Sequence, residues 1–183
     1  MHYRIEITPS LGFGRMELER SFKAYKPRFT RGSMLDPEAI PSPWIFTVEP
    51  NPGRELALND YYPEFHLMSD RMLNVLRSAG ASNLQAFPAT INDVSTGHTI
   101  ETYKVVNIVG LVACADQDVS DSLPVADKKY FLRLTIDEKQ AAGLLIFRLE
   151  ESRVDVIVNE SIANAIRGAA LRNIELEPVT GAG

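Results

Sequence analysis

Two stretches of the chain, residues 66–89 and 156–179, share one order of apolar and polar positions at an offset of 90 residues. In each, a short apolar run precedes apolar residues at helical spacing, and a second extended run that contains a proline follows. The pattern predicts a strand, a helix and a strand in both copies. Five positions are identical between the copies: Asn74/Asn164, Arg77/Arg167, Ala79/Ala169, Asn83/Asn173 and Pro88/Pro178. We therefore expect an internal repeat within one pseudo-symmetric domain.

Polar residues mark where each predicted helix begins and ends. Ser69 and Asn159 are suited to the N-cap, because their side-chain oxygens can accept a hydrogen bond from an unpaired N–H of the first turn. Gly80 is suited to end the first helix, and Pro88 and Pro178 are expected to end the strands that follow. The predicted buried stripes are Met72, Val75, Leu76 and Ala79 in the first copy and Ile162, Ala165, Ile166 and Ala169 in the second.

Most of the remaining chain is predicted to be strand. Residues 3–7 alternate like an edge or half-buried strand, and residues 103–114 read as one long strand that is buried over its second half. Residues 128–136 alternate, and we expect them to pair with residues 144–149 across a loop that contains Gly143. Consecutive strands favour an α+β fold with a largely antiparallel mixed sheet and two equivalent strand–helix–strand units.

The first 54 residues are expected to form a strand and an irregular, Pro-rich arm on a single domain of residues 1–183, whose core spans 55–179. Five of the eleven prolines lie between residues 36 and 53, and proline fixes φ and lacks an N–H. The segment Trp44–Val48 is predicted to pack onto the core as a short strand or plug. Basic and aromatic residues interleave within residues 8–35. We interpret them as a surface segment with inward aromatic rings rather than a nucleic-acid site.

Composition narrows the class of protein. The chain has 183 residues, of which 45% are hydrophobic, and a formal net charge of −5. A single globular domain fits this size, and the acidic balance disfavours a nucleic-acid partner. The longest nearly apolar run, residues 105–115, is too short for a transmembrane helix, which needs about 20 residues, so no membrane association is expected. The start of the chain lacks an apolar signal core, and there is one cysteine, so we expect a cytoplasmic protein.

No catalytic motif is recognisable in the sequence. His2, His66 and His98 are isolated from one another, without metal-ligand spacing, and we expect them at the surface or at its boundary. Cys114 lies in an apolar run, where burial raises the pKa of a thiol instead of activating it. We therefore expect neither enzyme activity nor a cofactor.

The densest charged feature is an acidic segment after residue 115. Four of its residues have the spacing of a calcium loop, at positions 1, 3, 5 and 12: Asp116, Asp118, Ser120 and Asp127. Asp121 stands where that loop needs glycine, and Asp127 replaces the bidentate glutamate, so a solvated acidic loop is the favoured interpretation. Its carboxylates Asp116, Asp118, Asp121 and Asp127 form a candidate docking edge for a basic partner.

Several of these segments together resemble one bacterial family, the eleventh immunity family of polymorphic-toxin systems, first described as a domain of unknown function. The resemblance spans about residues 55–179, and no resemblance is assigned to the first fifty residues. It is carried by Leu67-Met-Ser69, Gln85-Ala-Phe-Pro88, Tyr103-Lys-Val-Val-Asn107, Cys114-Ala-Asp116-Gln-Asp118-Val-Ser120, Ile146-Phe-Arg-Leu-Glu150, Val156-Ile-Val-Asn-Glu-Ser-Ile162 and Glu175-Leu-Glu-Pro178.

The resemblance implies an immunity-type protein that neutralises a cognate toxin, encoded by a neighbouring gene, through protein–protein inhibition. It carries over no catalytic residues. Two other hypotheses stay open from the residues themselves. One is a small ligand- or metal-binding domain or enzyme that uses the acidic loop 116–127, and the other is a structural domain that associates with itself.

Overall fold

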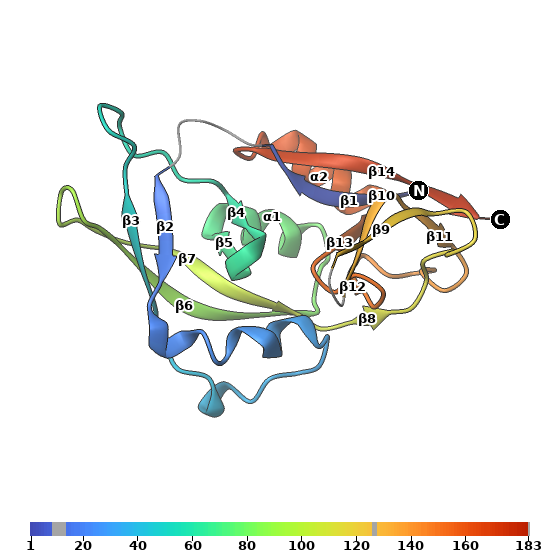
Figure 1. Cartoon of the computed structure of the whole chain (residues 1–183), viewed down its shortest axis with the longest axis horizontal. Helices are drawn as coiled ribbons and strands as arrows, with labels where there is room; N and C mark the ends of the chain where they lie inside the picture. Colours follow the sequence, from blue (N-terminus) through green and yellow to red (C-terminus); the bar gives the residue numbers. More distant parts are fainter. Residues whose placement is uncertain (9–13, 126–127, 183) are drawn as a thin grey trace.

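A computed structural model of the chain describes residues 1–8, 14–125 and 128–182, except for the side chains of residues 124–129 and 182. The fold is α+β, as the sequence predicts, with two helices, two curled six-stranded mixed sheets and a separate two-stranded sheet (Figure 1). In the described part of the chain, no helix has the length and apolar character needed to cross a membrane.

The first sheet is built from residues 15–108. Its strands are β2 (Arg15–Leu18), β3 (Trp44–Glu49), β4 (Tyr61–Tyr62), β5 (Leu67–Ser69), β6 (Leu84–Asp93) and β7 (Thr99–Ile108), in the order β2-β3-β6-β7-β5-β4. The 3-10 helices η1 (Arg20–Phe22), η2 (Lys26–Thr30) and η3 (Pro37–Ala39) precede β3, η4 (Pro63–Phe65) follows β4, and helix α1 (Asp70–Ser78) follows β5. Only the β3–β6 pair of this sheet is parallel among the described pairs.

The second sheet combines the C-terminal half of the chain with its first strand. Its strands are β1 (His2–Ile7), β8 (Leu111–Val112), β11 (Thr135–Asp137), β12 (Ile146–Leu149), β13 (Val156–Asn159) and β14 (Ile174–Ala182), in the order β11-β14-β1-β13-β12-β8. Helix α2 (Glu160–Ala169) follows β13, and β9 (Asp121–Val125) pairs with β10 (Lys128–Arg133) in the two-stranded sheet. The β11–β14 and β12–β8 pairs are parallel.

The two equivalent strand–helix–strand units that the sequence predicts are β5-α1-β6 and β13-α2-β14. The helices begin at Asp70 and Glu160, 90 residues apart, and residues 71–80 and 161–170 are buried or exposed at the same positions. Each helix has the predicted N-cap, because the side chain of Ser69 or Asn159 accepts a hydrogen bond from the backbone N–H three residues on, at 3.0 and 3.1 Å. The helices pack against each other, and one core cluster includes residues from both halves.

β1 takes the place in the second sheet that β7 takes in the first. The cross-strand rows are Met68–Lys104–Pro88 in the first sheet and Val158–Tyr3–Pro178 in the second. The expectation of an edge or half-buried strand at residues 3–7 is therefore wrong, since β1 lies between β13 and β14 and is mostly buried. Its neighbours come from the far end of the chain, and local alternation carries no information about such pairing.

Two predicted strand arrangements also differ from the structure. The long strand expected at residues 103–114 is two strands, because the chain turns at Gly110, whose φ is +138°. Residues 128–136 do not pair with residues 144–149: β10 pairs with β9, whereas β12 lies between β13 and β8. All four residues of β12 are buried, as expected for an inner strand with a neighbour on each side.

Pro88 and Pro178 lie inside their strands and do not end them. The neighbouring strand on one side begins only later, β3 opposite Ala89 and β11 opposite Thr180. Each proline is therefore located where one edge of its strand is unpaired, which is the position that a residue without an N–H can occupy.

The N-terminal segment packs its aromatic residues inward, as the sequence predicts. Trp44 lies in β3, an inner strand of the first sheet, and is 1% exposed. The rings of Phe22 and Phe29 lie with their centroids 5.2 and 5.3 Å from that of Trp44. This segment therefore supplies three strands, β1, β2 and β3, and part of the core.

Candidate docking surface

The hairpin of β9 and β10 presents an apolar face to solvent. Tyr130 lies opposite Leu123, and Phe131 lies opposite Ser122. Because side chains alternate along a strand, Phe131 enters a core cluster with 1% of its surface exposed, whereas Tyr130 and Leu123 are each 50% exposed on the other face.

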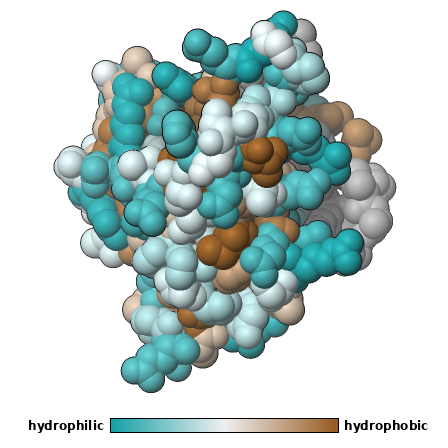
Figure 2. Space-filling view, turned by 90° about the vertical axis from the view of Figure 1, so that its left-hand side faces the viewer, coloured by the Kyte–Doolittle hydropathy of each residue, from teal (hydrophilic) through white to brown (hydrophobic). Residues whose placement is uncertain are grey.

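Exposed apolar side chains concentrate near this hairpin. Of nine large hydrophobic side chains exposed among the described residues, four lie between residues 119 and 132: Val119, Leu123, Tyr130 and Leu132. The end of the molecule away from the hairpin, which faces the viewer in Figure 2, shows hydrophobic side chains as small separate areas within a mainly hydrophilic surface. Clustering at one hairpin is the pattern expected of a contact surface, since singly scattered apolar residues are ordinary.

The acidic loop leads directly into this hairpin. Asp118 is exposed, and the backbone N–H of Asp118 donates to Oδ1 of Asp116 at 3.1 Å. Asp121 forms an exposed ion pair with Arg133 across the hairpin at 2.6 Å. Asp127 lies outside the described residues. Of the predicted docking carboxylates, Asp121 thus lies on the hairpin itself, and Asp116 and Asp118 lie in the loop that precedes it.

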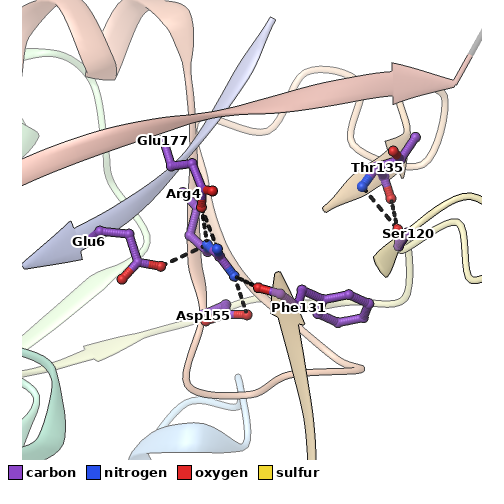
Figure 3. A network of polar contacts seen from close by, with 7 residues as sticks. All are labelled: Arg4, Glu6, Ser120, Phe131, Thr135, Asp155 and Glu177. Carbon is purple, nitrogen blue, oxygen red and sulfur yellow. Dashed lines mark hydrogen bonds and ion pairs between the residues drawn. The ribbon is translucent and has the colours of Figure 1, made fainter. Parts of the chain in front are cut away.

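Ser120 holds the loop against β11 instead of pointing toward the carboxylates. Its hydroxyl donates to the carbonyl oxygen of Thr135 at 3.1 Å and accepts from the backbone N–H of Thr135 at 3.0 Å (Figure 3). Within residues 1–8, 14–125 and 128–182, no group of three His, Cys, Asp or Glu side chains is placed to hold a metal ion.

Arg4 connects the hairpin to the second sheet (Figure 3). It lies in β1 and is 3% exposed. Its Nη1 donates to the carbonyl oxygen of Phe131 at 2.8 Å and lies 3.6 Å from a carboxylate oxygen of Asp155. Its Nε lies 2.8 Å from carboxylate oxygens of both Glu6 and Glu177. A buried cation with partners on three segments fixes the orientation of the hairpin.

Burial and charge act in opposite directions on the pKa values of this network. It raises the pKa of Asp155 and of Glu6, against the opposing effect of the Arg4 charge. Burial also acts to lower the pKa of Arg4, but its hydrogen bond to Glu177 and the carboxylates of Asp155 and Glu6 give a net increase. Arg4 therefore stays charged, and the hairpin is attached by a buried hydrogen bond from this cation to a backbone carbonyl.

Two of the three histidines are buried, so the expectation that all lie at the surface or its boundary is wrong. His2 and His66 are 8% and 4% exposed, and only His98 is on the surface. His66 stacks on Phe29 and has its Nδ1 3.1 Å from Nη2 of Arg148. Burial, followed by the Arg148 charge, lowers the pKa of His66 to about 3, so its ring is neutral and accepts from the guanidinium.

Cys114 is buried, as predicted. Burial raises the pKa of its thiol to about 12, with smaller contributions from the charges of Glu151 and Asp137. A thiol with this pKa contains almost no thiolate at neutral pH and is a poor nucleophile.

The family model of the immunity protein family (Imm11) matches residues 5–181. The chain belongs to the Imm11 family. Membership implies toxin neutralisation, and immunity proteins of this kind are generally not enzymes. The match extends through the N-terminal segment that the sequence resemblance left unassigned, in keeping with the strands that β1, β2 and β3 contribute to the two sheets. A comparison with curated proteins gives no match.

The acidic loop of this Imm11 protein has a counterpart in the first sheet. Leu18 pairs with Phe46 of β3, and Ala115 pairs with Ile136 of β11, which is 90 positions beyond Phe46. The next residue in each case, Glu19 or Asp116, donates its N–H to the adjacent strand, at 3.0 and 2.8 Å. The two segments do not resemble each other in sequence, so only the structure reveals that the acidic loop and the basic η1–η2 segment occupy equivalent positions.

Proposed function

We propose that this Imm11 protein binds its cognate toxin, the product of a neighbouring gene, in the cytoplasm and neutralises it by direct contact. The observation that carries the proposal is the family match over residues 5–181. We assign the contact to the hairpin surface, which comprises the exposed apolar residues Val119, Leu123, Tyr130 and Leu132 together with Asp116, Asp118 and Asp121.

The composition of the hairpin surface supports this assignment. Stable interfaces bury about 800 Å² on each partner and depend on a few central residues, among which tyrosine is frequent. Tyr130 and Leu123 would form the centre of the contact. The carboxylates beside them would attract a toxin with a basic surface and accelerate association. The toxin surface that fits is therefore apolar with a basic rim.

The attachment of the hairpin by Arg4 favours tight binding. Its guanidinium bonds to the Phe131 carbonyl, and Phe131 itself is buried in the core. A hairpin held in one orientation before binding loses little conformational entropy in the complex.

Co-expression with the neighbouring toxin tests the proposal. Wild type should restore growth and co-purify with the toxin, whereas Tyr130→Lys should lose most of the affinity. Val94→Lys is the matched control, because Val94 is also exposed, on the turn between β6 and β7, far from the hairpin surface in sequence. Unchanged toxicity with wild type and no complex would overturn the proposed function. Equal binding by Tyr130→Lys and Val94→Lys would overturn only the assigned surface.

The contribution of the carboxylates to association with the toxin has a separate test. Asp118→Lys should slow association and weaken its dependence on salt, while Glu101→Lys, an exposed change on β7, should leave both unchanged. Light scattering of the free protein checks the self-association hypothesis. Dimers that dissociate when the toxin is added would indicate that the same surface serves both contacts.

A further inference from the structure

A groove in the first sheet is lined by β2 and by residues of its neighbour β3. It has a volume of about 580 Å³. Five consecutive residues, Arg15–Glu19, line it along the whole strand, and Ile45, Thr47, Phe65, Arg20 and Lys23 complete the lining. β2 is the terminal strand of the sheet and pairs only with β3 among the described strands.

The hydrogen-bond pattern leaves backbone groups of β2 directed away from β3. In an antiparallel pair, alternate residues bond to the neighbouring strand, and the residues between them direct N–H and C=O outward. Glu19 donates to Ile45 of β3, so Glu17 and Arg15 bond inward as well. Met16 and Leu18 therefore direct their N–H and C=O groups to the free edge, at the spacing that an added strand requires.

The segment next to the groove is strongly basic. Residues 20–31 contain five cations and no acidic residue: Arg20, Lys23, Lys26, Arg28 and Arg31. The chain as a whole has a net charge of −5, so the positive charge of this segment is opposite in sign to the net charge of the protein. Two carboxylates also line the groove, Glu19 and Glu17, of which Glu17 pairs with Arg15 at 2.7 Å. Arg20 and Lys23, which line it as well, are exposed, and neither forms an ion pair with a described residue.

The aromatic residues of the segment are not arranged to stack on nucleic-acid bases. Phe22 and Phe29 are buried against Trp44. Two cations cover rings instead, with Lys26 Nζ 5.3 Å from the centroid of Phe65 and Arg28 Cζ 5.1 Å from that of Tyr25. Binding of single strands depends on exposed rings, so the favoured ligand is negatively charged and offers a backbone edge.

We propose that this groove binds an extended, acidic segment of a partner protein, which adds as a strand to the free edge of β2. Backbone hydrogen bonds to Met16 and Leu18 supply the alignment, and Arg20 and Lys23 select carboxylate side chains. The apolar side chains of Ile45 and Phe65 receive alternate residues of the bound segment. This site goes beyond toxin binding at the hairpin surface and carries the opposite charge.

The test uses the full chain, isotope-labelled for NMR, and two synthetic peptides of alternating residues with blocked ends. One peptide alternates valine with glutamate and the other alternates valine with lysine. The acidic peptide should shift the amide signals of Met16 and Leu18 at millimolar concentration or below, and the shifts should weaken at high salt. Equal shifts with the basic peptide, tighter binding of a single-stranded oligonucleotide, or no shift on β2 would each overturn the proposal.

Two variants separate strand addition from simple charge attraction. Met16→Pro removes an outward N–H and leaves the inward bonds of Arg15 and Glu17 in place, so binding should fall at least tenfold, whereas Met16→Ala should retain most of it. Lys23→Glu should also abolish binding, and Lys139→Glu, at an exposed site in the other half, should not. Thermal melting checks that each variant is folded. Equal binding by folded Met16→Pro and Met16→Ala would exclude strand addition.

Discussion

The two halves of this Imm11 protein share a strand layout and carry opposite charge at one equivalent place. In the first half, the segment after β2 begins with Glu19 and then contains five cations and no further acidic residue between residues 20 and 31. In the second half, the segment after Ala115 contains Asp116, Asp118 and Asp121 within six residues. The residues that precede the two segments pair at equivalent positions, Leu18 with Phe46 and Ala115 with Ile136. The strand layout therefore places both charged segments at one register, and under the two proposals above each segment would select a partner of opposite charge.

The interior of the two halves differs as well. His66 opens the first unit in the left-handed region, with φ of 54°, and Val156 holds the equivalent position in the second. His66 contacts Arg148 of β12, so this polar contact joins one half to the other. The repeated units are alike in their helices and differ at this first position.

The largest effect should follow from a charge placed in either helix. Met72 and Ile162 are equivalent and both 0% exposed. Met72→Asp and Ile162→Asp each bury an unpaired carboxylate, and each should lower the free energy of unfolding by about 4 kcal/mol. Urea denaturation followed by circular dichroism measures both losses.

Asn74→Asp and Asn164→Asp are the matched controls, because these residues are exposed on the same two helices. They should change stability by about 0.5 kcal/mol or less. A large loss of stability from Met72→Asp with a small loss from Ile162→Asp would show that the second helix is less buried than the first. The two halves would then not be equivalent.

The second prediction concerns the difference at His66. Its pKa in the folded protein is lowered to about 3 by burial and by Arg148, whereas the unfolded chain has a value of about 6.5. Below about pH 6.5 the unfolded state binds a proton that the folded state does not. The contribution of His66 to the free energy of unfolding is therefore complete above that pH. It falls by about 1.4 kcal/mol per pH unit as the pH decreases below it.

His66→Asn removes the titrating ring and keeps a residue that tolerates the left-handed region. The free energy of unfolding of this variant should decline less steeply between pH 6 and pH 4.5 than that of wild type, by about 2 kcal/mol over that range. His98→Asn, at the surface, should follow the wild-type slope. Parallel slopes for all three proteins would mean that His66 is not held neutral in the fold.

The sequence was sufficient to predict the helices of this fold. Their apolar stripes, the caps Ser69 and Asn159, and the C-terminal Gly80 are local features, and a helix is built from contacts between near neighbours. The α+β class followed from the strands between them. The same reasoning identified the acidic loop, because a dense run of carboxylates is visible without any pairing information.

Strand pairing could not be derived in the same way. β1 pairs with β13 and β14, more than 150 residues away, and nothing in the alternation of residues 3–7 points to those partners. The exposure of Tyr130 and Leu123 follows from the orientation of one hairpin, which Arg4 fixes from the other end of the chain. The equivalence of the acidic and basic segments can also be recognised only from the strand register, because the two share no sequence pattern.

The third prediction compares the helix caps. Asn159→Ala should lower stability by about 1 kcal/mol, the usual loss for an N-cap. Ser69→Ala should lower it by about 2 kcal/mol, because the buried Ser69 hydroxyl also donates to the carboxylate of Asp60. Ser69→Thr and Asn159→Asp keep a capping oxygen and serve as controls in the same thermal melts. Equal losses for the two alanine variants would show that the Asp60 contact contributes nothing.

The smallest effect should come from the residue that follows each helix. Gly80 and Ala170 are equivalent and both have positive φ, +99° and +47°. A Cβ is unfavourable in this region and absent only from glycine, so Ala170→Gly should raise the free energy of unfolding by about 0.5 kcal/mol. Gly80→Ala should lower it by about 1 kcal/mol, since the new Cβ also lies 3.2 Å from Cδ1 of Leu145. A gain in stability for Ala170→Gly and a loss for Gly80→Ala, in paired thermal melts, would show that both helix ends have a backbone conformation that favours glycine. Only the first helix end has glycine there. A loss of stability in both variants would mean that the Ala170 methyl makes packing contacts that outweigh the strain at that position.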